Sequence, residues 1–267
     1  MKYDQLINKQ FHILQRNKIL KDKYQFIYNE INTRIIQSIN DINLQINECL
    51  EIGIHNKKLY EYIDKKFPNS TYLASDISSK LLNEFFINQS KICFDNDKWP
   101  FQKNLFNLIV SNCYIHLSNN FNQLLQNIYS SLKSNGFFIA SIPGKNTLYE
   151  LKNSMILTDL ECYGGAYNRF LDFYSIDYIN ETLQKNKYKS LVIDIDTIQL
   201  RYKTFSNLLE DIRYLGHSNI NVGRKSFFEI KNYFKKVEEI YWKKFSNNNQ
   251  LIANIEIIYI SAWKNSN

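Results

Sequence analysis

Short apolar runs alternate with helical stretches along the first half of the chain, and this alternation constrains the fold more than any other feature. The apolar runs cover 49–52, 71–75, 91–94, 105–111 and 136–142, and the helical stretches cover 57–66, 78–86 and 119–133. Alternation of this kind predicts an α/β fold, with a largely parallel sheet and helices on both faces. Before the first run, apolar residues recur at three- and four-residue spacing, which predicts one or two amphipathic helices over 6–40.

The second half of the chain has a different pattern. Helices are predicted over 147–159, 175–185, 205–215 and 227–242, with a loop over 161–173 that contains Gly164-Gly165. The run "YKSLVIDIDTIQLRY" alternates as a strand with one wet face does, and 251–263 fits an antiparallel closing strand. The sequence therefore predicts a seven-stranded sheet, mostly parallel with an antiparallel last strand. We divide the chain into a helical segment (1–45), a core (46–145) and helical insertions with the closing strands (146–267).

Two helix boundaries are predicted from capping residues. Ser118 or Asn119 is expected to cap the helix over 119–133 at its start, because short polar side chains accept hydrogen bonds from the first free N–H groups. The dipeptide Asn135-Gly136 is expected to supply the turn that ends it.

The charge and composition restrict the kind of partner and compartment. The net charge is +7, but Lys supplies 27 of the 33 basic residues and is spread along the chain without a block, which indicates a solvated surface and no nucleic-acid partner. No apolar run reaches the ~20 residues of a membrane span, and residues 1–10 lack a targeting signal, so a cytoplasmic protein is expected. The four Cys are widely spaced, which favours reduced thiols over a metal site.

Several motifs along nearly the whole chain indicate a family. They are "FHILQRNKI", "KWPFQKNLFNLIVSNCYIHL", "PGKNTLYELKNSM", "YNRFL", "LLEDIRYLGHSNINVGRK" and "YISAWK". On these motifs the chain resembles the family that joins malonyl-acyl-carrier-protein O-methyltransferases of biotin synthesis to mitochondrial complex I assembly factors with a methyltransferase fold. The motifs "NTLYEL" and "LGHSN" resemble the assembly-factor branch, whose human-type members are associated with hydroxylating an arginine of a complex I subunit.

This resemblance implies a class I methyltransferase fold, Rossmann-like, with S-adenosylmethionine as cofactor. It also implies an acceptor borne by a protein or an acyl carrier protein, with a complex I subunit as one candidate. The implied cofactor residues are Glu51, Gly53, Asp76, Ile77, Asp95, Asn96 and Ser111. Gly53 matches the first glycine of the loop under the methionine part, Asp76 the acid that binds the ribose, and Asp95 the position beside the adenine.

Each of these assignments has an alternative. Asp76 could simply begin the helix that follows it. His55 and Lys57 stand where further glycines are expected, so their side chains should compete with the cofactor for space and weaken its binding.

On the acceptor side, the predicted residues are Tyr149, Arg169 and Arg224. A chain that uses Lys as its usual cation and has seven Gly should keep Arg for particular geometry, and both arginines follow a Gly closely. The planar guanidinium suits bidentate binding of a carboxylate, although packing against carbonyls is an equal alternative.

Three functional hypotheses follow. They are a methyltransferase, an arginine hydroxylase or assembly factor on the same fold, and a binding protein with a decayed cofactor loop. Methyl transfer asks mainly for positioning, so it needs no obvious catalytic base. Hydroxylation is harder to derive, because the chain has no His-x-Asp or His-x-Glu step of an iron triad.

Overall fold

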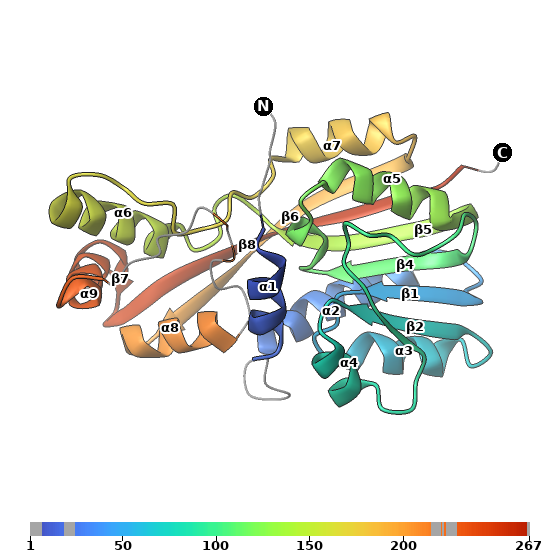
Figure 1. Ribbon diagram of the computed structural model, residues 1–267, viewed down its shortest axis with the longest axis horizontal. Helices are drawn as coiled ribbons and strands as arrows, with labels where there is room; N and C mark the ends of the chain where they lie inside the picture. The colour runs from blue at the N-terminus through green and yellow to red at the C-terminus, as the bar shows by residue number, and fades with distance from the viewer. Residues whose placement is uncertain (1–6, 19–24, 215–219, 221, 223–228, 266–267) are drawn as a thin grey trace.

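The computed structural model describes residues 7–18, 25–214, 220, 222 and 229–265, which form one mixed sheet with helices around it (Figure 1). The strands lie in the order β3-β2-β1-β4-β5-β8-β6, and β7 pairs with β8. The first five are parallel to their neighbours, whereas β8 is antiparallel to β5 and β6. Their bounds are β1 (Glu48–Ile52), β2 (Thr71–Asp76), β3 (Lys91–Cys93), β4 (Phe106–Asn112), β5 (Leu132–Pro143), β6 (Lys189–Tyr202), β7 (Ser246–Asn247) and β8 (Gln250–Trp263). The predicted α/β sheet is confirmed, and the two-residue β7 adds an eighth strand to the predicted seven.

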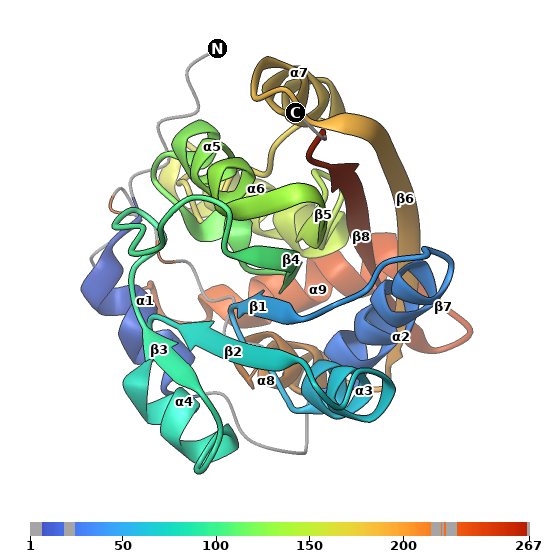
Figure 2. The same cartoon turned by 90° about the vertical axis from the view of Figure 1, so that its right-hand side faces the viewer.

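Helices cover both faces of the sheet, as Figure 2 shows. On one face, α2, α3 and α4 bury Ile31, Ile63 and Leu82 against the strands, and on the other α5 and α7 bury Leu125 and Ile179. The helices are α1 (Lys9–Arg16), α2 (Phe26–Asn40), α3 (Lys58–Lys66), α4 (Ser79–Phe85), η1 (Ile115–Leu117), α5 (Phe121–Ser131), α6 (Tyr149–Tyr163), α7 (Ile176–Lys185), α8 (Phe205–Tyr214) and α9 (Tyr233–Phe245). Within the described residues, no helix combines the length and the apolar character that a membrane span requires.

The sheet continues beyond its parallel part as a two-stranded extension. β5 pairs with 257–263 of β8, whereas β6 pairs with β8 from Leu251 to Trp263. Residues 197–202 and 251–256 therefore pair with each other past the end of β5, and α6, α8 and α9 pack around this ladder (Figure 1). A third apolar cluster, which includes Leu208, Tyr241 and Ala253, holds these helices to the extension.

The start of α5 differs from the prediction by one residue. Asn120, not Ser118 or Asn119, caps the helix by accepting a hydrogen bond from the Gln123 N–H at 3.0 Å. The two predicted residues are held by Asp97, which accepts hydrogen bonds from the Ser118 hydroxyl at 2.5 Å and from the Asn119 N–H at 3.0 Å. These bonds fix the preceding loop, so the helix begins one residue later.

Three further boundaries also differ. α5 ends at Ser131, and the Asn135-Gly136 pair lies inside β5, where Asn135 has a left-handed φ of 58°. α6 continues past the predicted end at residue 159 to Tyr163, because Gly164 closes it in the left-handed conformation, φ 73°. α9 begins at Tyr233, within the predicted 227–242, and residues 227–228 lie outside the described part of the chain.

Candidate functional site

The predicted cofactor residues gather where the parallel strands end. β1, β2 and β4 are neighbours, so their carboxyl ends lie at one edge, the place where ligands bind in open α/β sheets. Two serines tie this edge together: Ser75 and Ser111 donate to the carbonyl groups of Glu51 and Ile52 at 2.7 and 2.8 Å. Helix α1 lies across the same edge (Figure 1).

Asp76 occupies the centre of this edge and is fully paired. Its carboxylate accepts hydrogen bonds from the backbone N–H groups of Ser78 at 2.8 Å and Ile54 at 3.3 Å. The Arg16 guanidinium of α1 forms a salt bridge to it at 2.6 Å, and both side chains are almost completely buried. Asp76 therefore joins α1 and the loop after β1 to the end of β2.

Arg16 binds the loop after β1 as well as Asp76. It donates to the Ile54 carbonyl and lies 3.4 Å from Nδ1 of His55, with its guanidinium 5.0 Å from the ring centre of Tyr114. Burial acts to lower the pKa of Arg16, but the charge and hydrogen bond of Asp76, together with Tyr114 and Tyr28, outweigh it and the pKa is raised. The guanidinium therefore stays charged at this edge.

Gly53 is required here by a neighbouring ring. It has a left-handed φ of 78°, and a Cβ atom placed on it would lie 1.9 Å from Cγ of Tyr114. The Tyr114 hydroxyl accepts a hydrogen bond from the Ile77 N–H at 3.0 Å, and burial raises the pKa of this tyrosine. The close approach that Gly53 permits is thus made by Tyr114, and glycine is needed at this position whether or not a ligand is bound.

A second cation of α1 holds the next pair of acids. The Lys9 ammonium lies 2.8 Å from Asp95 and 2.7 Å from Asp97. Burial acts to raise the pKa of Asp97, but the hydrogen bonds from Lys9 and Ser118 outweigh it and the pKa is lowered. Asn96, between the two acids, is buried. The acids expected at the ribose and adenine positions are therefore both paired with α1.

His55 and Lys57, expected to compete with the cofactor for space, have different surroundings, and their effect on cofactor binding stays a prediction. His55 stacks on Tyr28 with ring centres 3.5 Å apart, and its Nε2 donates to the Asn112 carbonyl at 2.9 Å. Its Nδ1 then accepts from Arg16, which fixes the neutral tautomer. Lys57 precedes α3 and lines a separate polar groove with Asn29. His55 therefore belongs to the buried network of Arg16 and Asp76, whereas Lys57 lies at a groove lined by polar residues.

Glu51 is the most strongly perturbed carboxyl group of this region. It is buried in β1 and accepts a hydrogen bond from the Tyr72 hydroxyl. Burial raises the pKa of Glu51 to about 8, although the bond from Tyr72 acts to lower it. Glu51 is therefore largely protonated at neutral pH and adds little negative charge to the edge.

The predicted acceptor residues have different surroundings. Arg169 forms a salt bridge to Asp159 at 2.6 Å and another to Glu229 at 2.7 Å. Tyr149 is 52% exposed and packs edge-on against Phe245. Arg224 lies outside the described residues. Arg169 is thus neutralised by two carboxylates, and a role for these residues toward an acceptor stays a prediction.

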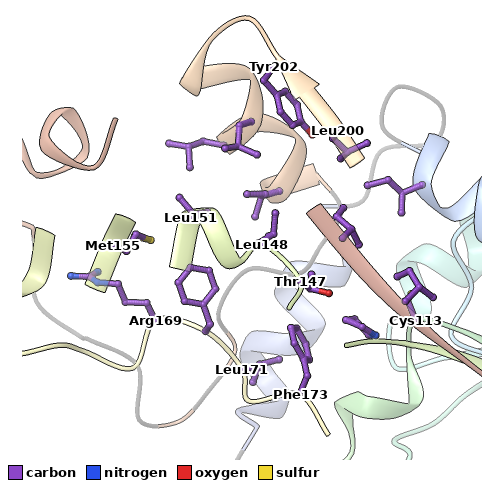
Figure 3. Close-up of a pocket in the computed structure, with 18 of the residues that line it drawn as sticks. Cys113, Thr147, Leu148, Leu151, Met155, Arg169, Leu171, Phe173, Leu200 and Tyr202 are labelled. Atoms are coloured by element: carbon purple, nitrogen blue, oxygen red, sulfur yellow. The ribbon is translucent and has the colours of Figure 1, made fainter. Parts of the chain in front are cut away.

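An apolar pocket of about 300 Å³ opens between the carboxyl edge and the extension of the sheet (Figure 3). Cys113 and Thr147 lie on one side of it, Met155 and Arg169 on the other, and Leu151 lies between them (Figure 3). Tyr28 also lines the pocket, and its ring is the one that stacks on His55. The pocket therefore adjoins the loop after β1.

Metal chemistry has no evident ligand set in the described residues. No group of three or more His, Cys, Asp or Glu side chains is placed there to hold an ion, and the four cysteines are free.

Lys9, Arg16 and Tyr114 were not identified from the sequence as site residues. They reach the edge from α1 and from the turn after β4, far along the chain from the acids and the glycine that they contact. The available signal was the scarcity of Arg, since Arg16 is one of six in a chain with 27 Lys. The residue types at the edge fit a nucleoside cofactor, with a tight turn and two carboxylates, but its ribose can reach Asp76 only if Arg16 gives way.

Comparisons with known proteins agree with this geometry. Residues 12–191 match the family described as "Methyltransferase domain". The chain is 27% identical over 245 residues to mouse "Arginine-hydroxylase NDUFAF5, mitochondrial", which covers 91% of this chain and 71% of that protein. It is 22% identical over 255 residues to the malonyl-[acyl-carrier protein] O-methyltransferase of Methylovorus sp., covering 91% and 84%. In fold it is similar to phosphoethanolamine N-methyltransferase 2 of Haemonchus contortus, solved with S-adenosylhomocysteine, with a TM-score of 0.53, 15% identity and 88% and 53% coverage.

Proposed function

Because the chain belongs to the methyltransferase domain family, we propose that it is an S-adenosylmethionine-dependent methyltransferase whose acceptor is carried by a protein or an acyl carrier. The observation that carries this proposal is the arrangement at the carboxyl edge. Gly53 makes a tight turn at the end of β1, and Asp76 and Asp95 follow the next two strands. Such carboxylates suit ribose hydroxyls and an adenine amino group.

When bound, S-adenosylmethionine supplies a methyl group already activated on a sulfonium, so the chain has to bind and orient rather than to move protons. Asp76 would accept hydrogen bonds from the ribose hydroxyls in place of those from Arg16. Asp95 would face the adenine, with its carboxylate held in place by the salt bridge to Lys9. Tyr114, packed on Gly53, would exclude water from the methionine side.

This role gives α1 a function in cofactor entry. Its two cations hold the two acids that the cofactor needs, so the helix must release Arg16 before Asp76 can bind a ribose. We expect binding to be slower or weaker than in a protein whose acid is free, because Arg16 must first leave Asp76.

Arginine hydroxylation is the second candidate. It is supported by the similarity to the mouse protein named as an arginine hydroxylase, which exceeds in identity the similarity to the malonyl-carrier methyltransferase. On that similarity a complex I subunit is a candidate partner.

Two measurements test the proposal. Titration calorimetry should show that the full chain binds S-adenosylmethionine and that Asp76→Asn weakens this binding. If neither the wild type nor the variant binds it, the remaining hypothesis is a binding protein with a decayed cofactor loop. Mass spectrometry should compare complex I subunits and malonyl-carrier protein from cells with and without this protein. We expect one of these acceptors to lack a methyl group in the cells without it. A missing oxygen atom on an arginine would instead establish the second candidate.

A further inference from the structure

The apolar pocket is lined by residues of the hydrophobic core. Its walls include Ile257 of the cluster beside α2, Leu171 of the cluster beside α5, and Leu208 of the cluster around the extension. All three apolar clusters therefore contribute to the walls. Its volume, about 300 Å³, is at the lower end of the ~300–1,000 Å³ of ligand pockets.

The polar groups on the walls are already satisfied. Arg169 is paired with Asp159 and Glu229, the Tyr202 hydroxyl donates to Asp211 at 2.9 Å, and the Thr147 hydroxyl donates to a backbone carbonyl at 2.8 Å. Burying an unpaired charge is costly, whereas each Å² of apolar surface removed from water contributes ~25 cal/mol. The interior therefore favours a hydrocarbon group over a charged one.

A cation lies at the edge of this interior. The Lys152 ammonium, on α6, is 5.7 Å from the ring centre of Phe170 and 5.8 Å from that of Phe173, and both rings line the pocket. No carboxylate of the described chain forms an ion pair with Lys152, although the charge of Asp172 acts on it. This cation is thus available to an anionic group at the pocket's rim.

We propose that the pocket binds an anionic amphiphile, with its hydrocarbon chain among the apolar walls and its carboxylate or phosphate at Lys152. Cys113 and Met155 lie on opposite sides of the pocket (Figure 3), and the residues between them are mainly apolar, which suits a hydrocarbon group. The Cys113 end adjoins Tyr28 and hence the loop after β1. Taking this ligand as the methyl acceptor rests on the proposed function, whereas binding itself does not.

The test uses the full chain and displacement of the fluorescent probe N-phenyl-1-naphthylamine. Dodecanoate represents a free acid, dodecanoyl-4′-phosphopantetheine a chain from a carrier, and dodecanol the neutral chain. We expect dodecanol to bind and at least one anionic ligand to bind more tightly; the tighter of the two identifies the source. Failure of all three to bind would overturn the proposal.

Two pairs of variants locate the ligand. Leu151→Trp fills the pocket and should weaken the binding of all three ligands by about tenfold or more. Leu160→Trp, on the exposed side of the same helix, should leave their binding unchanged. If Leu151→Trp does not fold, Leu209→Trp, at a half-buried wall position, replaces it. Equal effects of the wall variant and Leu160→Trp would refute the location.

The second pair concerns the charge. Lys152→Met keeps the apolar stem and should weaken the anionic ligands about two- to fivefold, the range of a partly exposed ion pair, without changing dodecanol. Lys185→Met, which removes a lysine of α7, is the control. An unchanged preference for anions in Lys152→Met would refute the head-group assignment.

Calorimetry with S-adenosylmethionine on the same proteins separates the two proposals. If the protein binds the dodecyl ligands but not S-adenosylmethionine, the methyltransferase proposal is refuted and the proposed ligand of the pocket is retained. If it binds S-adenosylmethionine but none of the dodecyl ligands, the pocket proposal is refuted and the methyltransferase proposal is retained.

Discussion

Replacing Asp76 by Asn should affect stability and cofactor binding together. Asn keeps the shape of the side chain, and its oxygen can still accept from the Ser78 N–H. It removes the charge that faces Arg16, whose side chain is 2% exposed. The substitution therefore leaves a buried guanidinium without its counter-ion.

The size of the effect follows from burial. Removing one partner of a buried ion pair costs ~3–5 kcal/mol, because the remaining charge is neither solvated nor paired. With ~2–4 °C for each kcal/mol in a chain of roughly this size, the melting temperature should fall by about 6–20 °C. If Asp76 also binds the ribose, affinity for S-adenosylmethionine should fall by a further ~1–3 kcal/mol.

Urea unfolding measures the first effect and titration calorimetry the second. The double variant Arg16→Met, Asp76→Asn should regain much of the lost stability, since neither charge is then left alone. Asp64→Asn, an exposed position on α3, serves as the control. An unfolding midpoint of Asp76→Asn equal to that of the control would refute the paired position of α1. Unchanged affinity would remove Asp76 from the cofactor site.

Three further substitutions test other parts of the site. Glu51→Gln should flatten the pH dependence of the free energy of unfolding. The folded pKa of Glu51 is about 8 and that of an unfolded Glu is ~4.3, so the stability of the wild type should fall as pH rises from ~4.3 to 8, and the variant should be the more stable protein at pH 8. Parallel curves of stability against pH, measured by urea unfolding, would contradict this. Arg169→Lys should lower stability by ~1–3 kcal/mol in thermal melts, because Lys cannot bridge Asp159 and Glu229 with one planar fork; unchanged melting would show that these bonds contribute nothing. Gly53→Ala should prevent folding or lower the melting temperature sharply, since its Cβ would overlap Tyr114, and a soluble variant with wild-type circular dichroism and melting would disprove the contact.

The order of strands and helices could be predicted because it depends on local periodicity. The apolar run of β4 is buried on both faces, as expected when helices cover both sides of a sheet. The errors arose where a tertiary contact moves a boundary. Asp97 holds the residues before α5, and Asn135 takes a left-handed conformation inside β5. Neither effect can be found from spacing alone.

The site could be predicted in part for the same reason. Gly53, Asp76 and Asp95 were assigned from the family resemblance, and the structure brings them to one edge because each stands at the end of a strand or just after one. Their partners could not be found, because Arg16 is 60 residues from Asp76 and Lys9 is 86 from Asp95. Those pairings are also the reason that Asp76→Asn is expected to cause a large loss of stability, because it leaves the buried Arg16 without its counter-ion.

The ladder that β6 and β8 form beyond β5 gives the protein a second cooperative unit beside the parallel sheet. Residues 197–202 and 251–256 pair past the end of β5, with the two-residue β7 beside Leu251, and the cluster that includes Leu208 and Tyr241 packs on them. Such a unit can open while the parallel sheet stays closed. Amide hydrogens of this ladder should then exchange with solvent sooner than those of β1 and β4, which gives the pocket walls on α6 and α8 their own opening equilibrium. A ligand too long for the closed pocket could enter during these openings without any unfolding of the cofactor edge.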